Sequence, residues 1–176
     1  DQGAALILTS VGKARTLGIP EDRWVYPHAG TEAWDHLYVS ERDNLHTSPA
    51  IRLTSRKLFD LTGYCANEMD YVDLYSCFPA AVQVSANEIG LSQDRALTVT
   101  GGLTFAGGPL NNYVMHSVAR TVDLLRGNPG SKGLVTANGG LLTKHALCIY
   151  STDAPDEPFA WADLQGEVDA MPRREV

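Results

Sequence analysis

The sequence predicts an α/β domain with a mixed, mostly parallel sheet between layers of helices. Short apolar runs typical of strands alternate along the chain with segments whose apolar residues recur at helical spacing. One of these segments, residues 110–126, is apolar on most sides, which is typical of a buried helix. The length of 176 residues is that of one ordinary domain and allows a substantial core.

The first third of the chain predicts two strands and one helix. The continuous apolar run within residues 3–9 suits a strand buried on both faces. A helix is expected at 11–17, because Gly18 and a proline follow it. A strand at 23–27 then leads into an irregular polar stretch over 28–47.

The middle of the chain has clear helix boundaries. Ser48 and Pro49 form an N-cap and first-turn pair, and apolar residues continue at helical spacing until Gly63. Strand 71–75 precedes a helix at 79–89.

The last part of the predicted fold is built around glycines. Strand 96–100 enters a loop with four glycines in the eight positions 101–108, and the buried helix 110–126 follows. Strands at 133–137 and 144–151 then form a hairpin through the turn 138–140.

The composition of the chain argues against several classes of function. Hydrophobic residues make up 44% and charged residues 20%, and the net charge of −7 argues against a nucleic-acid partner. No apolar run approaches the ~20 residues of a membrane span, and no secretory signal is visible. The three cysteines, Cys65, Cys77 and Cys148, lack CxxC spacing, which favours reduced thiols and a cytoplasmic location.

The glycine loop excludes two nucleotide motifs. A P-loop needs Lys and Ser or Thr directly after its last glycine, whereas Gly108 and Pro109 follow Gly107. The dinucleotide fingerprint G-x-G-x-x-G is also missing from this loop. A tight strand-to-helix connection without chemistry remains an alternative to a binding loop.

Four landmarks in order resemble the thiolase superfamily, specifically its C-terminal half. They resemble a D-G-A-A-A strand, the N-E-A-F or H-D-C-F strand end, the Gly-Gly…Gly-His-Pro-x-Gly loop and a C-x-G-G turn, and they lie at residues 1–10, 71–78, 101–110 and 136–140. Within that superfamily, the pattern is most similar to the thiolase-like and lipid-transfer-type acetyl-CoA acetyltransferases of actinobacteria. The resemblance implies a βαβαβαββ fold whose other half is supplied by the same polypeptide.

The resemblance implies where the domain boundaries lie along the chain. Residues 1–20 are expected to end the N-terminal thiolase half, and residues 21–152 to form the C-terminal thiolase domain. Residues 153–176 change character, with three prolines and many acids, and read as a linker or tail or as the start of a further domain. Because the chain lacks an initiator Met and starts inside an apolar run, we expect a piece of a longer polypeptide.

The resemblance also names candidate catalytic residues. The family histidine that supplies an oxyanion donor is replaced by Gly108, so impaired chemistry is expected. Cys77 stands where the sterol-carrier branch has its catalytic cysteine, and the alternative for it is a small buried hydrophobe. Tyr75 is a candidate proton or hydrogen-bond donor, or else a packing residue. Gly107, Gly108, Asn138 and Gly139 are expected to bind substrate, although Asn138 is also a natural turn residue.

For the remaining polar residues, the sequence supports only weaker predictions of their roles. Asn111 and Asn112 are expected to cap the buried helix, and His116 to lie in its core. The other histidines lack zinc-ligand spacing and evident partners, so no metal site is expected; they are His28, His36, His46 and His145.

Three functions follow from the resemblance. The first is an acyl-CoA C-acyltransferase of lipid metabolism that needs no cofactor beyond its coenzyme A thioester substrate. The second is a retro-aldol lyase that uses Tyr75 and pairs with an OB-fold partner. The third is a non-catalytic acyl-CoA or lipid-binding protein. The expected partners are acyl-CoA, the N-terminal half and either a second copy or an OB-fold protein; this segment alone is not expected to be active.

Overall fold

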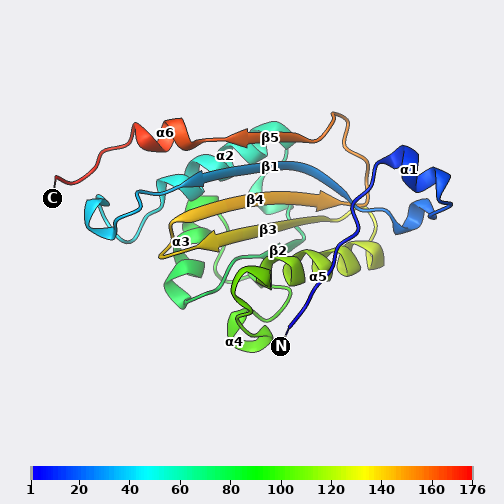
Figure 1. Ribbon diagram of the computed structural model, residues 1–176, viewed down its shortest axis with the longest axis horizontal. Coiled ribbons are helices and arrows are strands. Elements are labelled where there is room, and N and C mark those ends of the chain that lie inside the picture. The colour runs from blue at the N-terminus through cyan, green and yellow to red at the C-terminus, as the bar shows by residue number, and fades with distance from the viewer. Residues whose placement is uncertain (1, 176) are drawn as a thin grey trace.

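The computed structural model describes residues 2–175 as a five-stranded mixed sheet with helices on both faces (Figure 1). The order of the strands across the sheet is β2-β3-β4-β1-β5. Their bounds are β1 (Tyr26–Trp34), β2 (Tyr71–Asp73), β3 (Lys132–Gly139), β4 (Lys144–Ser151) and β5 (Ala160–Asp163). β4 pairs antiparallel with β3 and β1, whereas β2–β3 and β1–β5 are parallel. The sheet is therefore mixed as predicted, with parallel pairing in half of its strand pairs.

Within residues 2–175 the sheet is accompanied by six α-helices. Their bounds are α1 (Val11–Thr16), α2 (Pro49–Thr62), α3 (Pro79–Ile89), α4 (Leu103–Ala106), α5 (Tyr113–Gly127) and α6 (Gln165–Asp169). α2 and α3 pack on one face through a core that contains Ile51, Leu58 and Ile89. α5 lies on the other face, where Thr121 packs directly on Gly133 of β3 (Figure 1).

The predicted boundaries of α2 arise from local chemistry. Ser48 Oγ accepts a hydrogen bond from the Ile51 amide at 3.1 Å, and Pro49 occupies the first turn. Gly63 ends the helix in the left-handed region, with φ of 70°. The helix forms as predicted because its start and stop signals lie within the segment itself.

α5 is buried along one side. Tyr113, Ser117 and Leu125 are at most 1% exposed, whereas Val114 and Val122 are half-buried. Its first predicted turn is a 3-10 helix over Leu110–Asn112, and the Asn112 side chain makes no capping hydrogen bond. The prediction that asparagines cap this helix is therefore wrong for Asn112, whose Nδ2 lies 3.4 Å from His116 Nε2.

Two predicted strands do not form, and one predicted irregular stretch begins inside a strand. Residues 3–9 form no strand, and Ile7 and Leu8 are 93% and 81% exposed, because no neighbouring strand within residues 2–175 pairs with this run. Asp1, part of the same landmark, lies outside the described residues. Residues 96–100 are also not a strand, since side-chain hydrogen bonds to Asp73 hold much of this backbone. The predicted irregular stretch begins inside β1, where the polar residues His28 and Thr31 are buried.

The C-terminal segment is part of the same sheet. β5 pairs with β1, and Val168 of α6 is 1% exposed against Ala33 and Ala50. Residues 160–169 therefore belong to the sheet and its core rather than to a linker or a further domain. Their apolar residues Leu164 and Val168 provide this attachment.

Among residues 2–175, no helix has the length and apolar character needed to cross a bilayer.

Candidate functional site

The ends of β2 and β3 bring two predicted site residues together. Cys77 follows β2 and is exposed, and Asn138 lies near the end of the neighbouring strand β3. Asn138 Nδ2 donates a hydrogen bond to Cys77 Sγ at 3.2 Å. Cys77 is therefore not the buried hydrophobe that was its alternative, and Asn138 lies in the strand rather than in the turn.

The glycine loop reaches the same strand end through Ser76. Ser76 Oγ accepts a hydrogen bond from the Leu103 amide at 3.0 Å. Gly102 has φ of 77°, and a Cβ at this position would lie 2.7 Å from Ser76 Oγ. Glycine is required here by both the backbone conformation and the close approach. The start of the loop at Gly102 and Leu103 thus lies beside Ser76, the residue before Cys77, which Asn138 contacts.

Asp73 holds the loop in place from inside the protein. Its carboxylate is fully buried, and Oδ1 accepts hydrogen bonds from Tyr113 at 3.2 Å and Ser117 at 2.7 Å. Oδ2 accepts from the Thr98 hydroxyl and the Val99 amide, both at 2.9 Å. A buried carboxylate with this many donors fixes the segment that leads into the glycines. Asp73 had no sequence signal beyond its position in a strand.

Gly107 and Gly108 differ in their need for glycine. Gly107 has φ of 86°, and a Cβ there would collide with the Gln2 side chain. Gly108 has an ordinary φ, and the nearest atom to its added Cβ is Leu103 Cδ2 at 3.8 Å. The position of the family histidine therefore has space for a Cβ.

Tyr75 lies at the same strand end, with its amide bonded to Thr136 Oγ1 at 2.9 Å. Its ring packs edge-on against Tyr113 at 5.3 Å between centroids. Burial, together with the nearby Cys77 and Tyr113, raises the pKa of the Tyr75 phenol, so the phenol is neutral at physiological pH.

A small cavity of about 10 Å³ lies behind Asn138, between Tyr75, Thr136 and His145. Asn138 Oδ1 and His145 Nε2 are both buried without a hydrogen-bond partner within residues 2–175. About one water molecule is the most that such a volume holds. The cavity therefore places polar atoms next to the residue that contacts Cys77.

His145 connects this cavity to a buried carboxylate. Its Nε2 lies 3.3 Å from Asp35 Oδ2, at an angle that does not make a regular hydrogen bond. Burial alone raises the pKa of Asp35, but contact with His145 and hydrogen bonds from Ser48 and the Ala50 amide outweigh it and lower the pKa. The expectation that His145 lacks a partner is thus wrong, and only tertiary packing joins these distant residues.

Two further residues that the sequence analysis singled out, Gly139 and His28, lie at opposite ends of the sheet's strands. Gly139 is adjacent to Asn138 and pairs with Lys144 at the end of the β3–β4 hairpin. His28 contacts the Asp153 carbonyl at 3.0 Å and Tyr64, so it belongs to the far end of β1. No group of three or more His, Cys, Asp or Glu residues within 2–175 is arranged to hold a metal ion.

Comparison with solved structures gives the family. No family model matches the sequence. A monomeric SCP2-thiolase-like protein type 1 from Mycobacterium smegmatis is 39% identical, with a TM-score of 0.86 over 95% of this chain and 38% of that one. The chain belongs to the thiolase superfamily. It has the C-terminal half of the thiolase fold.

A more distant thiolase has the same fold. The peroxisomal 3-ketoacyl-CoA thiolase of Saccharomyces cerevisiae matches with a TM-score of 0.62 at 16% identity, over 80% of this chain and 37% of that one. It is a five-layered α-β-α-β-α structure built from two core domains of identical topology. This thiolase-superfamily chain spans less than two fifths of either protein and has one helix–sheet–helix set of layers.

Proposed function

We propose that this chain is the C-terminal part of a thiolase-type acyl-CoA C-acyltransferase, of the acetyl-CoA acetyltransferase type. Cys77 is the base that moves a proton at the α-carbon of the acyl-CoA. The observation that supports this role is the 3.2 Å contact from Asn138 Nδ2 to Cys77 Sγ, beside the glycine loop. An amide donor stabilises a thiolate, which is the form of cysteine that acts as a base.

The rate of this enzyme is lower than that of thiolases with an intact histidine. Gly108 has no side chain to donate to an oxyanion. Loss of one such donor typically costs about 10²–10³ in rate. Tyr75, a neutral phenol at the same strand end as Cys77, is the replacement donor in this proposal.

The active protein requires a second thiolase half. Exposed apolar residues at Ile7 and Leu8 and the half-buried side of α5 support an apolar partner surface. We place that half in the same polypeptide, with acyl-CoA as substrate, no further cofactor and a cytoplasmic location. The similar mycobacterial protein is monomeric, which favours a monomer over a homodimer.

A retro-aldol lyase is the second candidate function. The observation that favours it is the packing of Tyr75 on Tyr113, whose hydroxyl contacts Thr100 Oγ1 at 2.6 Å. This arrangement gives the site two phenols and no histidine donor at position 108. An OB-fold partner belongs to this alternative.

Thiolytic cleavage of a panel of 3-ketoacyl-CoAs by the full-length protein tests the proposal. Cys77→Ala should abolish turnover while acyl-CoA binding, measured by calorimetry, persists. Cys65→Ser is the matched control, because Cys65 is also an exposed cysteine. Turnover that survives Cys77→Ala refutes the assignment of the base.

A retro-aldol substrate, added to this panel, separates the alternatives. Loss of activity in Tyr75→Phe but not in Cys77→Ala, on a retro-aldol substrate, supports the lyase. Saturable acyl-CoA binding without any turnover supports a binding protein and contradicts the acyltransferase.

A further inference from the structure

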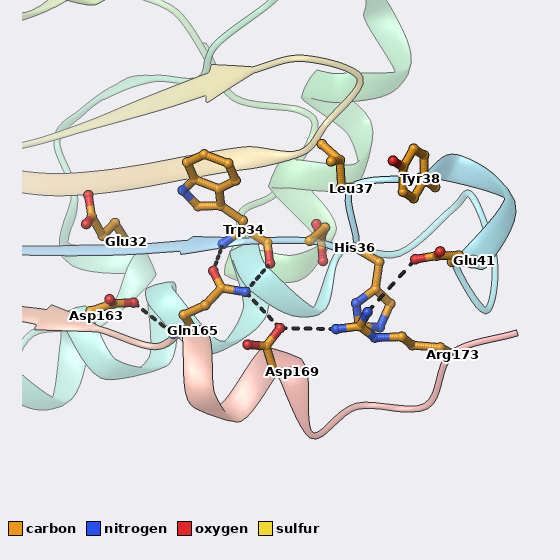
Figure 2. A pocket seen from close by; sticks show the side chains of 11 residues that line it. Glu32, Trp34, His36, Leu37, Tyr38, Glu41, Asp163, Gln165, Asp169 and Arg173 are labelled. Carbon is orange, nitrogen blue, oxygen red and sulfur yellow. Dashed lines mark hydrogen bonds and ion pairs between the residues drawn. The ribbon is translucent and has the colours of Figure 1, made fainter.

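Two cavities lie at the ends of the strands, and their polar groups are engaged differently. The larger, of about 470 Å³, lies beneath α6, where the Gln165 side chain bonds both the amide and the carbonyl of Trp34 (Figure 2). The smaller, of about 10 Å³, lies behind Asn138 and is also lined from α2 and α3. Two polar atoms beside it are buried without a hydrogen-bond partner within residues 2–175: Asn138 Oδ1 and His145 Nε2. Buried polar atoms without partners are costly, so two of them beside one cavity indicate that they act together.

His145 and Asn138 are direct neighbours in the sheet. They are partners in the antiparallel register of β3 and β4, so their side chains leave the same face of the sheet. Side chains at such positions have Cβ atoms about 4.5–5.5 Å apart. His145 is only 4% exposed, and both residues line the small cavity. The imidazole ring and the amide group therefore face the same enclosed space.

Asp35 determines which ring nitrogen of His145 carries a proton. Asp35 Oδ2 lies 3.3 Å from His145 Nε2, and Ser48 and the Ala50 amide hold this carboxylate in place. A carboxylate favours the proton on the nitrogen beside it, so Nε2 carries one whether the ring is neutral or charged. Because the contact with Asp35 lacks the geometry of a regular hydrogen bond, this N–H is free to donate toward the cavity.

The orientation of the Asn138 amide follows from this donor. With Oδ1 toward the cavity, the amide accepts from the His145 N–H, either directly or through one water molecule, which is the most that this volume holds. The opposite orientation sets two donors against each other and turns Oδ1 toward Cys77, where it repels a thiolate. The donor behind the amide therefore favours the arrangement in which Nδ2 donates to Cys77 Sγ at 3.2 Å.

We propose that His145 is a positioning residue for Cys77 and acts through the Asn138 amide. The contacts lead from a buried carboxylate to the imidazole, from the imidazole to the amide, and from the amide to an exposed thiol. The effect on turnover rests on the proposed function, in which Cys77 is the base. The effect on the thiol itself does not.

Alkylation of Cys77 by iodoacetamide in the full-length protein at neutral pH tests this role, because the thiolate is the form that reacts. His145→Asn should slow the labelling about twofold or more, since the shorter side chain places no donor at the position of Nε2. His145→Gln should retain the rate, because its amide nitrogen reaches that position. Ile51→Val is the matched control: it changes an apolar wall of the same cavity and should leave the rate unchanged.

A double-mutant cycle shows whether the effect passes through the amide. In the Asn138→Ala background, His145→Asn should slow the labelling of Cys77 no further. Equal slowing with and without the Asn138 side chain overturns the role. It is also overturned if His145→Gln or Ile51→Val slows the labelling as much as His145→Asn does, since the effect is then one of packing.

The positioning role and the proposed function can fail separately, because labelling does not depend on turnover. Turnover that survives Cys77→Ala refutes the base, whereas the labelling rates still decide the role of His145. If Cys77→Ala abolishes turnover but labelling is insensitive to His145, the positioning role alone is refuted. Where both hold, kcat for thiolysis should fall in His145→Asn and be retained in His145→Gln.

Discussion

Asn138 has two different environments around one amide group. Its Nδ2 donates to the Cys77 thiol, whereas its Oδ1 faces the buried cavity beside His145. The hydrogen bond to Cys77 Sγ fixes which end of the amide faces the sulfur, because only the nitrogen end donates. The state of Cys77 is therefore linked to a buried polar group that solvent does not reach.

Asn138→Ala should slow alkylation of Cys77 by iodoacetamide at neutral pH about threefold or more. The lost hydrogen bond is one that stabilises the thiolate, which is the form of cysteine that reacts. Asn138→Asp should slow the reaction further, because a carboxylate repels the thiolate. Mass spectrometry of the labelled peptides measures each cysteine separately.

The other two cysteines are internal references for this experiment. Cys65 is exposed and should react at the same rate in every variant. Burial raises the pKa of Cys148 to about 11, so Cys148 should label slowly throughout. Faster labelling of Cys77 in Asn138→Ala would show that the amide only shields the sulfur.

Gly107→Ala and Gly108→Ala should differ in stability. Gly107 has a positive φ that costs a non-glycine residue about 1–3 kcal/mol, whereas the change at Gly108 should remain within about 0.5 kcal/mol. Urea denaturation of the two variants measures the difference. Equal costs would mean that the loop adopts another conformation.

Among the helices, α5 connects the packed core to the glycine loop of the candidate site. Tyr113 and Ser117 on its buried side donate to Asp73, and Asp73 in turn holds the segment that leads into the glycine loop. A change in how α5 packs therefore moves the loop as well.

Val118→Asp should destabilise the protein by about 3–5 kcal/mol, because Val118 is 9% exposed and a buried charge there has no counter-ion. Arg120→Asp, on the exposed side of the same helix, is the control and should change the stability little. Chemical denaturation compares the two. A Val118→Asp protein that unfolds like the unmodified one would show that this side of α5 is not packed.

The elements that the sequence predicts well carry their own boundary signals. α2 and α3 begin at Pro49 and Pro79, and both end before a glycine with positive φ. The failures at residues 3–9 and within β1 concern strands, whose existence depends on a partner elsewhere in the chain. The convergence of Cys77, Asn138 and the glycine loop was predictable from the order of the landmarks. The contact of Asp35 with His145 was not, because the two residues lie 110 positions apart and the sequence contains no local sign of their contact.

At the scale of the whole molecule, stability should fall in two steps as the pH is lowered. Burial lowers the pKa of His28 below 6.5, so its contribution is present above that value and is lost as the pH falls toward the lowered folded pKa. The lowered pKa of Asp35 gives a second contribution, present above 3.8 and lost below it. Urea titrations across this pH range measure both steps.

His28→Gln should remove the upper step, and His46→Gln, at an exposed histidine, should keep it. Stability that rises on acidification between pH values of about 6.5 and 5 would contradict the direction of the His28 shift.

The central pair of the sheet has a consequence for how the chain folds. β1 and β4 align Tyr26 with Ser151 and Trp34 with Lys144, so residues more than 100 positions apart must meet before the sheet has a centre. Closing so long a loop is slow, and on a ribosome it waits until β4 has emerged from the exit tunnel. Until then β1, flanked later by β4 and β5, exposes both of its edges. A nascent chain stalled before β4 is therefore the species that chaperones should retain most strongly.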